Sequence, residues 1–197
     1  MPPDVAALFT RANSVYKTMP GVEAYDAQRD ARTYVGPWPV VAHPPRARWS
    51  MTNGVVLSRY PHKADEFAWG NDGGLFEFAV ATVRRFGGVL EHPAQSRAFG
   101  HFGMPRIGRG RDRFGGWSCE VRQVDWGHRA EKRTWLYIVG VGPDELPQLP
   151  AGGAKPSGRC ELMGKAEREH TPLAFAAWLV EVARRVGDKR EGVCRAA

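Results

Sequence analysis

Short apolar runs, each ending at polar or turn-forming residues, are spread along the chain. Runs of this length bounded by Gly, Pro or Asp are typical of buried strands. The last run, TWLYIVGV, is continuously apolar, as in a strand that is covered on both faces. The pattern predicts strands over residues 5–10, 21–26, 39–42, 88–91 and 134–141.

Two longer segments carry apolar residues at helical spacing. The first spans Asp65–Phe86 and is most regular over Gly74–Phe86, where two glycines end it. The second spans Thr171–Val186, with Thr171 as a candidate N-cap and Pro172 at the first helical position. Alternating strands and helices predict an α/β fold, a minimal Rossmann-like and mostly parallel sheet with helices on both sides.

Length and composition fit a single domain. The chain has 197 residues, 43% of them hydrophobic, which is enough for a core that folds without covalent staples. We expect one domain over residues 1–187 and a charged C-terminal tail over 188–197.

The cysteines and the absence of long apolar runs bear on location. Three scattered cysteines without C-x-x-C spacing predict neither a disulfide framework nor a metal site. We find no signal-peptide core and no apolar run long enough to cross a membrane. A cytoplasmic location without a membrane partner is the expectation.

The charge points to a polyanionic partner. Lys and Arg outnumber Asp and Glu by 28 to 21, so the formal net charge is +7. A basic surface attracts nucleic acid by counterion release, which makes DNA or a nucleotide the expected partner. The alternative is that the chain is simply rich in arginine.

Three motifs stand in a fixed order along the chain. VVAHPPRARW places two prolines after a predicted strand, where α/β enzymes hold ligands. GGVLEHP carries Glu91 and His92 at the end of the next strand, and DWGHRAEKRTWLYIVG carries Arg133 ahead of the last one.

In this order the motifs resemble those of DNA cytosine-5 methyltransferases of the phage type, and the chain also resembles small phage and prophage proteins with the same segments. The resemblance implies a bacterial host cell and S-adenosylmethionine as cofactor, with Phe9 and Asp26 as its contacts. The alternative for Asp26 is a capping role at a helix start. It implies that Glu91 holds the target base. Arg133 then matches one arginine of the last motif.

The chain departs from that family at the catalytic position. Arg46 follows Pro44 and Pro45 where the family has a cysteine, and an arginine remains protonated and is no nucleophile. The first strand also lacks a glycine-rich turn. His43 stands where amino-methylating enzymes place Asp or Asn, and with His92 it is a candidate for proton transfer.

Further basic and aromatic residues are candidates for nucleic-acid contact. A Gly/Arg loop carries Arg109, Arg111 and Arg113, whose guanidinium groups suit phosphates, and Trp49 suits stacking on a base. A solvated loop and a structural Trp are the alternatives. After the first strand, another candidate phosphate contact is formed by Arg11, Tyr16 and Lys17, with plain surface as the alternative.

Three functions remain open from the sequence. The first is a methyltransferase-like enzyme acting on DNA or nucleobases without the covalent cytosine-5 mechanism. The second is a non-enzymatic DNA-binding or anti-defence protein. The third is a nucleotide-processing hydrolase or transferase that uses Glu91 and His43 on the same core.

The replacement of the nucleophile gives a direct test. DNA carrying 5-fluorocytosine traps enzymes that attack the base through a thiolate. Because Arg46 cannot attack, we expect no covalent adduct on a denaturing gel. An adduct would show that another nucleophile, with Cys119 the foremost candidate, has taken over.

Overall fold

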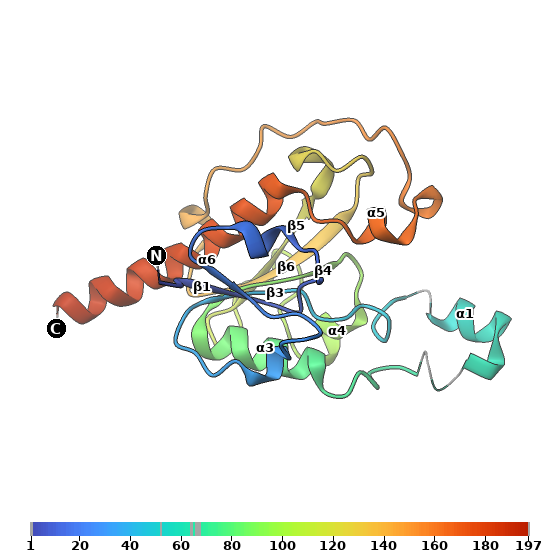
Figure 1. Cartoon of the computed structure of the whole chain (residues 1–197), viewed down its shortest axis with the longest axis horizontal. Coiled ribbons are helices and arrows are strands. Elements are labelled where there is room, and N and C mark those ends of the chain that lie inside the picture. The colour runs from blue at the N-terminus through green and yellow to red at the C-terminus, as the bar shows by residue number, and fades with distance from the viewer. Residues whose placement is uncertain (1, 52, 64, 66–67, 197) are drawn as a thin grey trace.

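The computed structural model describes residues 2–51, 53–63, 65 and 68–196, and these form an α/β arrangement around one six-stranded open sheet (Figure 1). The strands are β1 (Val5–Leu8), β2 (Val22–Ala24), β3 (Val40–Ala42), β4 (Gly88–Pro93), β5 (Trp117–Arg122) and β6 (Arg133–Val139). The α-helices are α1 (Asn53–Arg59), α3 (Leu75–Phe86), α4 (Arg97–His101), α5 (Lys165–Glu169) and α6 (Leu173–Ala196).

The sheet has the order β2-β1-β3-β4-β6-β5. The pairs β1·β2, β1·β3 and β3·β4 are parallel, whereas β6 runs antiparallel to both β4 and β5. Five strands therefore share one direction. The chain leaves β1 toward β2 on one side and then returns to place β3 on the other side, so the strand order reverses between β1 and β3.

Helices cover both faces of the sheet. Figure 1 shows α6 across one face and α3 across the other. Side chains alternate accordingly along each buried strand: Val5 and Ala7 pack with α6, whereas Ala6 and Leu8 pack with α3. Because both faces are covered, the central strands are apolar at every position, which explains their continuous apolar runs.

Most of the predicted elements are confirmed. The strands near residues 5–10, 21–26, 39–42, 88–91 and 134–141 are present, and the regular half of the first predicted helix is α3. Phe67, which belonged to the other half of that prediction, lies outside the described residues.

Two features differ from the expectation. β5 was not predicted, because WSCEVR mixes polar and apolar residues, as suits a strand that pairs only with β6 at the sheet edge. The predicted helix end at Val186 is also wrong, since α6 continues to Ala196. The helix continues through Gly187 and Gly192, since each internal Gly costs only about 1 kcal/mol. Beyond Gly187, Lys189 pairs with Glu145 and Arg190 donates to the Arg85 carbonyl.

A close approach of two backbones sets the register of β3 and β4. Gly88 has φ +117°, and a Cβ at this position would collide with the backbone oxygen and nitrogen of Val40. Only glycine fits both the conformation and the space. The two glycines after α3 therefore end the helix and also allow β4 to pair with β3.

This approach yields a stability prediction. Gly88→Ala should lower the free energy of unfolding by about 3 kcal/mol or more, because backbone atoms of Val40 cannot move aside. Urea denaturation measures the change. Gly100→Ala is the matched control: Gly100 lies in α4 with open space around it, and the substitution should be neutral or slightly stabilising. Equal effects of the two substitutions would contradict the argument.

Candidate functional site

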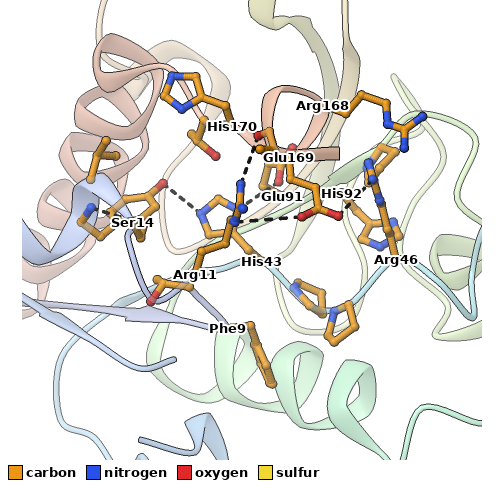
Figure 2. A pocket seen from close by; sticks show the side chains of 18 of the residues that line it. Phe9, Arg11, Ser14, His43, Arg46, Glu91, His92, Arg168, Glu169 and His170 are labelled. Carbon is orange, nitrogen blue, oxygen red and sulfur yellow. Dashed lines mark hydrogen bonds and ion pairs between the residues drawn. The ribbon is translucent and has the colours of Figure 1, made fainter. Parts of the chain in front are cut away.

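A cleft lies at the carboxyl edge of the parallel strands, where the strand order reverses. In open α/β sheets this is the position where ligands bind. The cavity has a volume of about 670 Å³, within the range of small-molecule sites. It is lined by the loops after β1 (9–16) and β3 (43–46), by the end of β4 (91–93), by Lys132 and by residues 166–171 (Figure 2).

Three side chains in this cleft form a continuous hydrogen-bonded chain. The Glu91 carboxylate lies at the end of β4, and its Oε2 is 2.9 Å from Nδ1 of His43, which follows β3. The other ring nitrogen, Nε2, is 2.9 Å from the Tyr16 hydroxyl. Residues from three separate segments therefore meet in one Glu–His–Tyr arrangement.

The protonation states follow from the surroundings. Burial alone would raise the pKa of Glu91, but the hydrogen bond with His43 and nearby positive groups lower it below its ordinary value. The ionised carboxylate then accepts the proton on Nδ1. When Nδ1 carries the only ring proton, Nε2 accepts from the Tyr16 hydroxyl. Burial and the Glu91 charge raise the pKa of Tyr16 well above its usual value, so this hydroxyl keeps its proton.

Gln123 fixes the carboxylate from the other side. Its Nε2 donates to Glu91 Oε1 over 3.1 Å and to the Thr134 hydroxyl over 2.9 Å, and the residue is fully buried. Because both carboxylate oxygens are held, the orientation of His43 is fixed as well. Sequence reasoning missed Gln123, which belongs to no motif, and it assigned Tyr16 to phosphate binding rather than to this chain.

His92 is placed beside this chain but on the opposite face of β4. It is 2% exposed, and its ring lies edge-to-face against Phe76 with centroids 5.0 Å apart. Among the described residues neither ring nitrogen has a hydrogen-bond partner. Burial lowers the pKa of His92 to about 4, and the Pro45 carbonyl opposes this shift without making a hydrogen bond of normal geometry.

The cleft also contains cationic side chains. Arg46 lines it together with Glu91, as the motif order suggested, but the two do not pair. The Arg46 guanidinium instead lies 3.3 Å from the Glu169 carboxylate, which also faces Arg11 (Figure 2). Lys132 donates to the His170 carbonyl over 2.7 Å.

Only one of the two residues assigned to a cofactor lies in the cleft. Phe9 lines the cleft and has φ 60°, an uncommon conformation for an aromatic residue, directly after β1. Asp26 does not line the cleft. Its carboxylate pairs with Lys17 and accepts the backbone N–H groups of Gln28 and Arg29, so it caps its own loop.

The residues assigned to nucleic acid also lie outside the cleft. Trp49 is 3% exposed and donates its indole N–H to Asp72, so its ring is structural. It borders a second cavity of about 900 Å³, which Arg109 also lines. The remaining guanidinium groups have local partners: Arg111 donates to the Gly115 carbonyl, Arg113 lies over Phe114 and Arg133 pairs with Glu120.

Cys119 does not take the place of the missing nucleophile. It lies on β5, at the edge of the sheet far along the strand order from β3, and it does not line the cleft. Burial raises the pKa of its thiol to about 12, so the thiol remains protonated at neutral pH.

The chain matches no known family model, and it has no significant match among curated proteins. No described helix is both long and apolar enough to span a bilayer.

The buried His92 predicts an acid-sensitive stability. The unfolded chain binds a proton near the ordinary His pKa of about 6.5, whereas the folded chain resists it until about pH 4. Neutral, buried His92 therefore makes its full contribution to the free energy of unfolding above pH 6.5. This contribution falls by an amount on the order of 3 kcal/mol as the pH falls toward 4. Urea denaturation at pH 7 and pH 4.5 should show a smaller loss for His92→Asn than for the parent chain. An equal loss would mean that other groups control the pH response.

Proposed function

We propose that the protein is a nucleotide- or nucleobase-modifying enzyme in which His43, oriented by Glu91, acts as the general base. The observation that carries this proposal is the hydrogen-bonded chain Glu91–His43–Tyr16 in the cleft. A carboxylate that fixes the tautomer of an imidazole and stabilises its protonated form is a recurrent arrangement for proton abstraction.

The finer classification of the fold, as Rossmann-like and methyltransferase-like, belongs to the same proposal. Support comes from the reversal of strand order between β1 and β3, from helices on both faces, and from the ordered motifs. The cleft lies at that reversal, and each motif that resembles the cytosine-5 family contributes a residue to its wall.

A nucleotide fits the charge and the size of the cleft. Arg11, Arg46 and Lys132 present positive groups to a cavity of about 670 Å³, while Phe9 and the two prolines after β3 add apolar surface. Cationic forks suit phosphate, and apolar walls suit a base. The net charge of +7 favours such ligands over large distances.

The residues do not fit S-adenosylmethionine. Asp26, the acid expected to hold a ribose, is engaged by Lys17 and by two backbone N–H groups outside the cleft. The loop after β1 presents Arg11 in place of a glycine turn, which brings a positive charge toward a sulfonium. We therefore derive no step through this cofactor.

The proposed proton transfer needs no covalent intermediate. The Tyr16 hydroxyl passes its proton to Nε2 of His43 as it receives one from the attacking group of the substrate or from water. Glu91 stabilises the imidazolium that results. In this role Glu91 acts through His43, so it is a positioning residue rather than the reader of a base.

The test uses nucleoside mono-, di- and triphosphates and DNA, with product formation followed by mass spectrometry. We expect turnover of one of these classes without S-adenosylmethionine. His43→Ala should lower kcat by about 10²–10⁴-fold, because it removes the general base. Glu91→Gln should lower kcat while leaving KM nearly unchanged, and Tyr16→Phe should do the same if the hydroxyl relays the proton.

His62→Ala is the matched control, since His62 is exposed and does not line the cleft. Its turnover should equal that of the parent chain. Full activity of His43→Ala would refute the proposed base. Tight nucleotide binding without turnover of any class would instead favour the non-enzymatic alternative.

A further inference from the structure

Two arginines from different segments converge on a single carboxylate at the mouth of the cleft. Arg11 follows β1 and Arg46 follows the two prolines after β3, and Figure 2 shows both side chains directed at Glu169. Glu169 is the last residue of α5, far from both arginines in sequence. The Glu169 carboxylate thus lies between the guanidinium groups of Arg11 and Arg46.

The contacts of Glu169 are long for charged partners. The Nε atom of Arg11 is 4.0 Å from Oε2, and a terminal nitrogen of Arg46 is 3.3 Å from Oε1. Charge-assisted hydrogen bonds are normally about 2.7–2.9 Å. The Glu169 carboxylate does not approach either guanidinium group to that distance, so much of their hydrogen-bonding capacity is unused by Glu169.

The segment that carries Glu169 is attached mainly by polar contacts. Arg11 donates to the Ala166 carbonyl, and Lys132 donates to the His170 carbonyl. Arg129 pairs with Glu167 at the surface. No residue of α5 is buried, and a segment held in this way opens at low cost compared with a helix packed on the sheet.

We propose that Arg11 and Arg46 form a subsite for the terminal phosphate of a mononucleotide. In the free protein the Glu169 carboxylate occupies this subsite, and the phosphate displaces it on binding. A tetrahedral phosphate has three free oxygens and reaches both forks with short contacts. The proposal deepens the proposed function, on which it rests for the nucleoside part of the ligand.

Charge favours a terminal phosphate over an internal phosphodiester. When Glu169 leaves, two guanidinium charges lose their anion. A phosphomonoester carries nearly two negative charges at neutral pH and balances both, whereas a diester carries one. The apolar wall formed by Phe9, Pro44 and Pro45 lines the same cavity, where it is available to a base or ribose.

Calorimetric titration of the full chain tests the subsite without any need for turnover. The probes are inorganic phosphate, adenosine 5′-monophosphate, adenosine, and a ten-nucleotide DNA strand that lacks terminal phosphates. We expect Glu169→Gln to bind phosphate and the monophosphate about tenfold more tightly, because the competing anion is gone. Arg46→Gln should weaken both by about tenfold or more, and Arg46→Lys by less.

Glu161→Gln is the control, since Glu161 is an exposed acid on the same part of the chain that does not line the cleft. Its affinity should equal that of the parent chain. Circular dichroism verifies that each variant is folded, and Arg46→Lys keeps the test valid if Arg46→Gln is not. Unchanged affinity in Glu169→Gln, or tighter binding of the DNA strand than of the monophosphate, would overturn the proposal.

His43→Ala separates the two proposals. It should bind phosphate as tightly as the parent chain, because no hydrogen bond or ion pair joins His43 to Glu169 or to either arginine of the subsite. Binding that is retained in His43→Ala, together with full turnover by that variant, would refute the general base and leave the subsite standing. Loss of phosphate binding in His43→Ala would overturn the subsite as drawn.

Discussion

The buried carboxylate of Glu91 is the constraint around which the cleft is arranged. An ionised carboxylate at the end of β4, largely removed from water, is costly unless each oxygen has a partner. His43 from the loop after β3 supplies one, and Gln123 supplies the other. The pairing thereby ties together the ends of β3 and β4 and the segment after β5.

The parallel pairing of the central strands makes this arrangement possible. Because β1, β3 and β4 share one direction and one register, their carboxyl ends meet at a single edge. The close approach at Gly88 allows β4 to lie against β3 and brings Glu91 level with the loop that carries His43. The Glu91–His43–Tyr16 chain and the cationic side chains therefore lie in one cleft with separate partners. Glu91 is paired with His43, and Glu169 is paired with Arg11 and Arg46.

Three features separate the chain from the cytosine-5 methyltransferases that its motifs resemble, and all three point to the same kind of ligand. Arginine in place of the thiol, the tethered Asp26 and the cationic loop after β1 all reduce the fit to covalent methyl transfer. The same changes suit a phosphorylated ligand. The two prolines after β3 line the cleft directly before Arg46, whose guanidinium lies 3.3 Å from the Glu169 carboxylate.

The sequence alone predicts the α/β class, the main strands, helix α3 and a common sheet edge for His43, Arg46, Glu91 and His92, because strand ends in a parallel sheet are forced together. It did not determine β5 or the full length of α6, since an edge strand needs little apolar pattern and a helix tolerates internal glycines when later contacts hold it. Nor did it reveal that Tyr16 and Gln123 complete the Glu91–His43 chain, or that Glu169 fills the space between Arg11 and Arg46. These contacts join residues that are distant in sequence. The sequence around each residue would look the same if its side chain faced water instead of a partner. Only the packing of the whole chain decided which of them meet.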